Sequence, residues 1–321
     1  MLSLFVCASL LLAAMICENF IRCAEFYLAS DRGEEIPGID EGFVPGGYCT
    51  APDGVLLSGY MRDSGQARVY LIREGGESNY IDLLDDNLEP FISRASGIEF
   101  FDGYMYLTGP DGLYMYYYED VRDGLAETDY YGIIETYITP EWCSIYDGNL
   151  YVGSRDGDDA PAWQRIYGSH GDFTELITVF RLDESVKFGI WTRPLCAIAS
   201  PPGVTGAYIC YKGFTFTAYD GEWGSSLLFY RFSTADASSI KLVSDERERT
   251  VPLYFLDEQK FRHDMTLPPK VEDLVCLDGV LSIVSSSVAD SGKVGEILAL
   301  DSFYTLPFDA KYFEEAEESE N

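Results

Sequence analysis

The chain has 321 residues, of which 54 are acidic and 22 are basic, so its formal charge at neutral pH is −32. This charge excludes nucleic acid as a partner, because phosphate binding needs lysine and arginine, and it also excludes peripheral docking on anionic lipid. Hydrophobic residues make up 47% of the chain, enough for a sizeable core, while the presence of only two histidines excludes a metal centre with several histidine ligands.

The N-terminus begins with a hydrophobic segment. Residues 1–17 carry no charged side chain, and this length suits the core of a signal peptide or a short membrane anchor. No cleavage site fits well, since Arg22 stands where a small residue is expected before a cut after Ala24. We expect residues 1–24 to be a signal peptide or membrane anchor, with a buried helix of the domain as the alternative. The protein is then extracytoplasmic, either secreted or anchored to the cell membrane.

Four segments share one pattern, in which a short apolar strand is followed by Asp-Gly and a second strand. They cover residues 48–59, 97–109, 142–154 and 273–286, with the pairs beginning at Asp53, Asp102, Asp147 and Asp278. Asp-Gly between β-rich runs predicts a hairpin, because a type I′ turn needs positive φ at both central residues. The gap of 131 residues before the last pair leaves room for one enlarged unit. Residues 196–213 fit there, with Pro202-Gly203 replacing Asp-Gly.

A third and a fourth strand are expected after each hairpin. The third strands are expected at residues 67–74, 112–119, 174–183, 225–232 and 295–302. The fourth strands are expected at residues 78–85, 129–137, 185–192, 250–257 and 303–309. Four-stranded units that recur at this spacing predict an all-β fold, a single β-propeller with five blades. The alternatives are a sixth blade within residues 196–270 and an array of β-sandwiches.

The propeller is expected to span residues 25–310 as one domain. Residues 311–321 are acidic and have no hydrophobic period, which predicts a disordered tail. Five cysteines follow the leader without any Cys-x-x-Cys pair, so neither a disulfide framework nor a zinc site is predicted.

Three short stretches carry a family resemblance. They are Gly-Phe-Val-Pro-Gly-Gly at residues 42–47, Ser-Gly-Tyr-Met at 58–61 and Pro-Pro-Lys-Val-Glu at 268–272. In these the chain resembles a group of exported β-propeller proteins from anaerobic Gram-positive bacteria. The resemblance implies the fold and export but no reaction. The chain departs from the group's pattern at Gly46, where glutamine is usual, and at Arg94, where histidine is usual.

The first strand of each propeller blade lines the central channel. Six positions before the four Asp-Gly pairs stand Gly47, Ser96, Glu141 and Glu272. With Arg94 and Asp273 nearby, two carboxylates and an arginine are expected to converge at one mouth of the channel. Glu141 and Glu272 are candidate metal ligands, because calcium prefers oxygen donors.

Other candidate chemistry is sparse. His170 lies in a loop and is a candidate general base or ligand, with a histidine bonded to local backbone as the alternative. The chain has no Gly-x-Ser-x-Gly and no phosphate-binding glycine loop. The tyrosine-rich residues 104–120 offer rings that suit a glycan or a peptide, or that pack between blades.

The sequence therefore favours a non-catalytic, extracytoplasmic binding or scaffold propeller without a cofactor. Its ligand is expected at the funnel, among Arg94, Glu141, His170, Glu272 and Asp273, or its partner is a cell-surface glycan or protein on a blade face. The alternative is a calcium-dependent hydrolase of the lactonase or phosphotriesterase type, with Glu141 and Glu272 as metal ligands. A glycosidase without metal, with two carboxyl groups across the funnel, is the third hypothesis.

Overall fold

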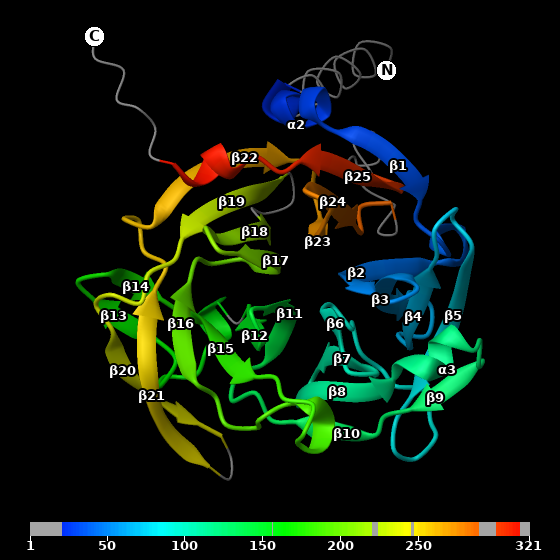
Figure 1. Ribbon diagram of the computed structural model, residues 1–321, viewed down its shortest axis with the longest axis horizontal. Helices are drawn as coiled ribbons and strands as arrows, with labels where there is room; N and C mark the ends of the chain where they lie inside the picture. Colours follow the sequence, from blue (N-terminus) through cyan, green and yellow to red (C-terminus); the bar gives the residue numbers. More distant parts are fainter. Residues whose placement is uncertain (1–20, 156, 220–223, 245–246, 289–299, 315–321) are drawn as a thin grey trace, which may run out of the picture.

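The computed structural model describes residues 21–155, 157–219, 224–244, 247–288 and 300–314. Five β-sheets stand around a central axis as the blades of a propeller (Figure 1). The innermost strands of blades 1 to 5 are β2, β6, β11, β17 and β23, and each packs against the innermost strands of both neighbouring blades. This closed ring confirms the predicted five-bladed β-propeller.

Each blade contains four antiparallel strands that follow one another from the axis outward. Blade 1 consists of β2 (Phe43–Ala51), β3 (Gly54–Met61), β4 (Ala67–Ile72) and β5 (Ser78–Leu84). Blade 2 consists of β6 (Ile98–Phe101), β7 (Tyr104–Gly109), β8 (Gly112–Tyr117) and β10 (Gly132–Ile134). Blade 3 consists of β11 (Pro140–Tyr146), β12 (Asn149–Ser154), β15 (Glu175–Arg181) and β16 (Cys196–Ser200). Blade 4 consists of β17 (Val204–Cys210), β18 (Gly213–Tyr219), β19 (Ser225–Arg231) and β22 (Phe261–Leu267).

Blade 5 joins the two ends of the chain. Its inner strands are β23 (Val271–Leu277), β24 (Val280–Ser285) and β25 (Ser302–Pro307), and its outermost strand is β1 (Asp31–Glu35) from the N-terminal region. Arg32 on β1 forms a bidentate salt bridge with Asp301 and also donates to Ser302. The prediction of residues 303–309 as the fourth strand was wrong, because β25 is the third strand and β1 completes the sheet.

The enlarged stretch of the chain is an insertion and not a sixth blade. Between the third and fourth strands of blade 4, a hairpin of β20 (Ser238–Val243) and β21 (Glu248–Phe255) crosses to the outer edge of blade 3 and pairs in parallel with β16. A smaller hairpin, β13 (Ile166–Gly168) with β14 (Gly171–Phe173), is inserted between β12 and β15.

These insertions correct three predicted elements. Cys196–Ser200 is the fourth strand of blade 3 and not the start of a hairpin, so Pro202-Gly203 leads into blade 4 and is no turn between paired strands. Residues 185–192, predicted as that fourth strand, contain the 3₁₀ helix η3 (Lys187–Gly189). Residues 250–257 belong mostly to β21, because the fourth strand of blade 4 is β22.

The hairpin turns next to the axis occur in two forms. Three are Asp-Gly turns with positive φ at both residues, for example 48° at Asp147 and 70° at Gly148, as the sequence predicted. In blade 1 the two loop residues are Pro52 and Asp53, and Gly54 begins the second strand at a φ of 149°. Blade 4 has the same form, with Gly213 beginning its second strand at a φ of 150°.

The hydrophobic core lies between neighbouring blades. Middle strands such as β4 and β8 are buried on both faces, so they are apolar without the alternation of a half-exposed strand. One core cluster joins Val69 and Leu71 of blade 1 to Ile98 and Leu107 of blade 2. The six cysteines of the described residues are free thiols.

Shorter elements lie around the blades. They are α2 (Ala24–Ala29), α3 (Tyr118–Arg122), β9 (Glu127–Asp129), η1 (Ile39–Glu41), η2 (Gly157–Asp159) and η5 (Ala310–Phe313). Phe313 of η5 is buried against blade 4, so residues 311–313 are packed and not part of a disordered tail. Residues 1–20 and 315–321 lie outside the described residues. Over the described ranges, no helix combines the length and apolar character of a membrane span.

Candidate functional site

The inner strands carry an irregularity at the same place in four blades. Each has a β-bulge near its start, between Pro45 and Tyr48, Pro140 and Trp142, Val204 and Gly206, and Val271 and Asp273. A bulge adds a residue to one strand and changes the direction of its side chain. Counted back six residues from the first loop residue of each hairpin turn, the matching residues of the five blades are Gly46, Ser96, Glu141, Thr205 and Glu272.

The second strands add a matching set of residues. We count seven positions from the first residue of each second strand. The seventh position lies near the end of that strand or just beyond it. In blades 1 to 5 these residues are Tyr60, Pro110, Arg155, Tyr219 and Ser286. Four of them, all except Pro110, line one cavity together with bulge residues of the inner strands. Matched positions of the repeat therefore build much of the site, with two such residues from each of blades 1, 4 and 5 and one each, Ser96 and Arg155, from blades 2 and 3.

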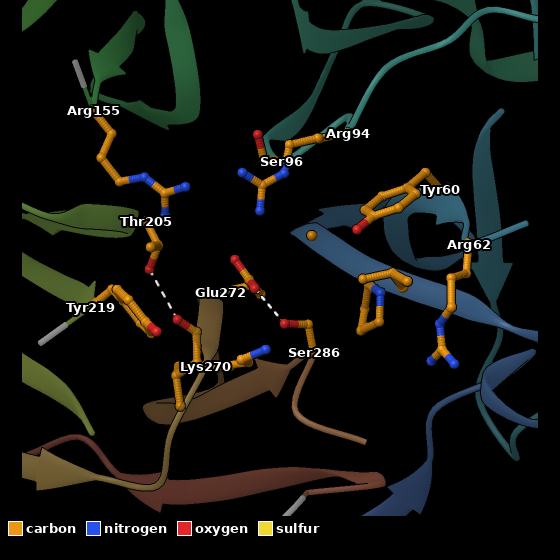
Figure 2. A pocket seen from close by; sticks show the side chains of 14 residues that line it. Tyr60, Arg62, Arg94, Ser96, Arg155, Thr205, Tyr219, Lys270, Glu272 and Ser286 are labelled. Carbon is orange, nitrogen blue, oxygen red and sulfur yellow. Dashed lines mark hydrogen bonds between the residues drawn. The ribbon is translucent and has the colours of Figure 1, made fainter. Parts of the chain in front are cut away.

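This cavity, which we call the funnel pocket, has a volume of about 300 Å³ and lies where the inner strands begin. Four basic residues line it: Arg62, Arg94, Arg155 and Lys270. Figure 2 shows the guanidinium groups of Arg94 and Arg155 turned toward the same space as the Glu272 carboxyl. A cationic pocket thus lies on the axis of a strongly acidic chain.

Glu272 stands at the base of the funnel pocket. Ser286 donates a hydrogen bond to its Oε1 (Figure 2). The pKa of Glu272 is raised, because burial outweighs the Ser286 hydrogen bond and the charges of Arg94 and Arg155, which lower it. The carboxyl therefore has cations on one side, one fixed hydrogen-bond donor and further acceptor capacity toward the pocket.

Glu141 is held apart from the pocket by an ion pair. Its Oε1 lies 2.8 Å from a guanidinium nitrogen of Arg155, and the two side chains are 18% and 24% exposed. Glu141 lines an adjoining cavity of about 220 Å³, which shares Arg94 and Ser96 with the funnel pocket. Glu141 and Glu272 are near enough for the charge of Glu141 to raise the pKa of Glu272.

The donor set does not fit the expected calcium ion. Within the described ranges, no group of three or more His, Cys, Asp or Glu side chains is placed to hold a metal. Glu141 is paired with Arg155, and Glu272 faces Arg94 and Arg155, so a dication there would meet positive charges before it met enough oxygen ligands. We derive no metal-dependent step from this site.

Asp273 turns away from the funnel pocket. It is 2% exposed, and its carboxyl accepts backbone N–H bonds of 2.8 Å from Tyr48 and from Leu274. Burial raises its pKa well above the usual range, and these two hydrogen bonds oppose the shift. Asp273 thus links β23 to β2 in the inner ring. It does not line the funnel pocket, whereas its neighbour Glu272 does.

Glu99 has a corresponding place in blade 2. Its Oε1 accepts a 2.9 Å hydrogen bond from the Ile145 N–H, which links β6 to β11. Burial raises the pKa of Glu99 to about 8, against the lowering effect of that hydrogen bond and of a second from the Phe100 N–H. The inner ring therefore contains two carboxyl groups that join neighbouring blades.

His170 lies at the outer edge of blade 3, in the turn between β13 and β14 (Figure 1). Its Nδ1 is 2.8 Å from Oδ2 of Asp257, and its ring stacks on Phe255 at a centroid distance of 4.2 Å. It lines a separate cavity of about 790 Å³ between the two inserted hairpins. The structure therefore brings Arg94 and Glu272 together, with Glu141 beside them, and leaves His170 elsewhere.

The sequence prediction missed several pocket residues that the repeat could have indicated. Lys270 stands two residues before Glu272, just as the predicted Arg94 stands two residues before the matching Ser96. The second-strand residues would have been found by counting seven residues from each turn. In blade 1 the match is Gly46 and not Gly47, because its turn begins one residue earlier than the Asp-Gly pair.

Comparison with known proteins finds only distant structural similarity. No protein-family model and no curated protein matches the chain. A solved structure provisionally assigned as a gluconolactonase is similar, with 10% identity, a TM-score of 0.38 and coverage of 88% of this chain and 92% of the other. The WD40 domain of Toxoplasma gondii coronin shows 8% identity, a TM-score of 0.35 and coverages of 80% and 69%. BamB from Moraxella catarrhalis shows 10% identity, a TM-score of 0.30 and coverages of 86% and 97%.

Proposed function

We propose that the protein is a binding propeller that holds a small anionic ligand in the funnel pocket. One observation carries this proposal. Arg62 and Arg94 both line the pocket, and within the described residues neither forms a salt bridge, although the chain has 54 acidic residues for 22 basic ones. Arginine in so acidic a chain readily forms a salt bridge, so two arginines that form none beside the same cavity favour an external anion.

The charge balance of the pocket supports the same ligand class. Arg62, Arg94 and Arg155 contribute three positive charges to the wall of the pocket, which Lys270 also lines. The nearby carboxylates of Glu141 and Glu272 offset two of them when both are ionised. A concave site with this excess focuses the field and attracts anions. Guanidinium groups also match carboxylate, phosphate and sulfate in geometry, because they donate two parallel hydrogen bonds.

The cellular setting is part of the proposal. The uncharged leader and the high negative charge support an extracytoplasmic location, where the pocket would meet small molecules or charged groups of a surface glycan or protein. Fractionation of cells that express the full chain with a C-terminal tag tests this. Recovery of the tag only from the cytoplasmic fraction would contradict export and leave the ligand proposal intact.

Thermal unfolding tests the anion site. The melting temperature of the full-length protein is measured in chloride and then in acetate, phosphate and sulfate at the same ionic strength. A ligand that binds only the folded state stabilises it by mass action, and we expect at least one anion to raise the melting temperature by about 2–5 °C.

Variants locate the effect in the pocket. Arg94→Ala is expected to abolish the anion-dependent rise, whereas Arg193→Ala, which removes an exposed arginine outside the pocket, is expected to retain it. Equal responses of the two variants, or the same melting temperature in all four anions, would overturn the proposal.

A further inference from the structure

The funnel pocket contains a carboxylate that an inorganic anion does not need. Glu272 repels an anion held by Arg94 and Arg155, yet it lies among those arginines and is kept in place by Ser286. A carboxylate accepts hydrogen bonds and donates none when ionised. Its place among the cations therefore fits a ligand that brings both a negative group and a hydrogen-bond donor.

Neutral hydroxyl groups complete the wall of the pocket. Tyr60 and Tyr219 occupy the same position in the repeats of blades 1 and 4, and they turn their hydroxyls into the cavity from opposite sides (Figure 2). Ser96 of blade 2 adds a third hydroxyl. Tyrosine presents an apolar ring and a polar tip, a combination that suits the faces and edges of a sugar ring.

The size and net charge of the funnel pocket restrict the class of ligand further. A volume of about 300 Å³ is at the small end of ligand pockets, with room for a monosaccharide and not for a long oligosaccharide. The excess of positive charge disfavours a zwitterion such as an amino acid, because its ammonium group would meet the same arginines and lysine.

Resting on the proposed anion site, we infer that the ligand is a sugar acid, a small molecule with a carboxylate beside several hydroxyls. Arg94 and Arg155 bind the carboxylate. Glu272 accepts a hydrogen bond from a ligand hydroxyl, and the tyrosines border the ring. The ligand is either a free sugar acid or the uronate end of a surface polysaccharide, since both present the same groups.

Isothermal titration of the full-length protein tests this inference. The probes are glucuronate, galacturonate and gluconate, together with acetate, glucose, sulfate and glycine at matched ionic strength. We expect at least one sugar acid to bind about tenfold more tightly than acetate, glucose or glycine, because charge-assisted and hydroxyl contacts then act together. The methyl glycoside of glucuronate separates the two sources, because it retains affinity if the site takes a polysaccharide end and loses it if the free sugar acid is required.

The Glu272→Gln variant separates this inference from the proposed anion site. Glutamine keeps an acceptor for Ser286 but removes the charge, so we expect weaker sugar-acid binding and equal or tighter sulfate binding. If sulfate binds wild type more tightly than every sugar acid, the sugar-acid inference is overturned and the anion site stands. If glycine binds best, the ligand is a zwitterion and the inference is again overturned. If no probe binds, both proposals are wrong.

Discussion

Blades 1, 2 and 4 differ from blades 3 and 5 at the inner-strand residue five positions before the hairpin turn. In the first group this residue is glycine, and the fifth residue of the second strand has a hydroxyl; the pairs are Gly47 with Ser58, Gly97 with Thr108, and Gly206 with Thr217. The hydroxyls bond to the next blade, as Ser58 Oγ does to the Ala95 carbonyl at 2.6 Å and Thr217 Oγ1 to the Glu272 carbonyl at 3.3 Å. These three blades use the position to bring neighbouring inner strands together.

Blades 3 and 5 have large residues at the same position. Trp142 pairs with Gly153, and its ring occupies the space where a side chain on Gly153 would lie, since a Cβ there would be 2.1 Å from Trp142 Cε2. Asp273 pairs with Val284 and bonds to the Tyr48 N–H of blade 1. These two blades are also the ones with a glutamate at the bulge. The repeat therefore separates three blades with glycine at this position from two blades that have a large residue there and a glutamate one position earlier, in or beside the pocket.

The largest effect on stability is expected at Gly97, the glycine of blade 2 at this position. Gly97→Ala would put a Cβ 2.7 Å from Trp142 Cα and 2.9 Å from the Cys143 nitrogen, and backbone atoms cannot move aside without opening the seam between blades 2 and 3. We expect this substitution to lower the free energy of unfolding by about 3 kcal/mol. Urea denaturation measures it.

Gly168→Ala is the matched control, because a Cβ on Gly168 meets no atom within 4 Å and the residue lies on the inserted hairpin. Equal stability of the two variants would show that close approach at Gly97 is not needed for the ring.

A smaller effect on stability is expected in blade 2, where Glu99 joins β6 to β11. The pKa of Glu99 is raised from 4.5 to about 8, so the folded state prefers the protonated carboxyl. Its stabilisation is complete below pH 4.5 and is lost as the pH rises through 8, because the unfolded chain ionises first. Relative to Glu99→Gln, we expect wild type to lose on the order of 2–3 kcal/mol between pH 4.5 and 8.

The difference between the two profiles of stability against pH reports the titration of Glu99 together with its charge coupling to Asp273, whose pKa Glu99 raises. The titration of Glu272 is common to both proteins. A pH-independent difference would mean that the pKa of Glu99 is not raised in the folded protein.

The two forms of inner turn provide the next test. Replacing Asp147-Gly148 with Ala-Ala forces two alanines to positive φ, and we expect a loss of about 1–2 kcal/mol in the free energy of unfolding. Replacing Tyr211-Lys212 with Ala-Ala changes the blade 4 turn, where neither residue has positive φ, and is expected to change stability by less than about 0.5 kcal/mol. Equal losses would remove backbone strain as the reason for the Asp-Gly pairs.

Local sequence patterns predicted most strands of the blades. The pairing of strands that lie far apart in the sequence could not be predicted in this way. Three Asp-Gly pairs form the turns predicted for them. In blade 1 the prediction of an Asp53-Gly54 turn was wrong by one residue, because the loop residues are Pro52 and Asp53, and in blade 4 the start of the hairpin was misplaced. The sequence of β1, Asp31–Glu35, is exposed throughout and has no apolar alternation, so nothing local marks it as the strand that completes blade 5. The strand character of residues 250–257 was recognised, but its pairing with the previous blade cannot be inferred from local composition.

The funnel site was predicted in part for the same reason. Glu141 and Glu272 were found because a count along one strand reaches them, and Arg94 because it is close in sequence. Arg155 was missed because it follows the second strand, β12, and its contribution depends on how two strands pair. Asp273 was misplaced because the bulge turns neighbouring residues in opposite directions, and a shift of one residue reverses the face of a strand.

The smallest predicted effect is a change in anion affinity. It concerns the different roles of Glu141 in blade 3 and Glu272 in blade 5. Glu141 pairs with Arg155, so it competes with any anion for that guanidinium. Glu141→Gln is expected to free Arg155 and to tighten anion binding by about two- to fivefold, the range of a partly exposed ion pair. Titration with the best-binding anion measures this change, and Glu184→Gln, an exposed glutamate outside the pocket, controls for the loss of one negative charge. If Glu141→Gln instead weakens binding, Glu141 orients Arg155 toward the ligand, and both carboxylates of the second group then support the site.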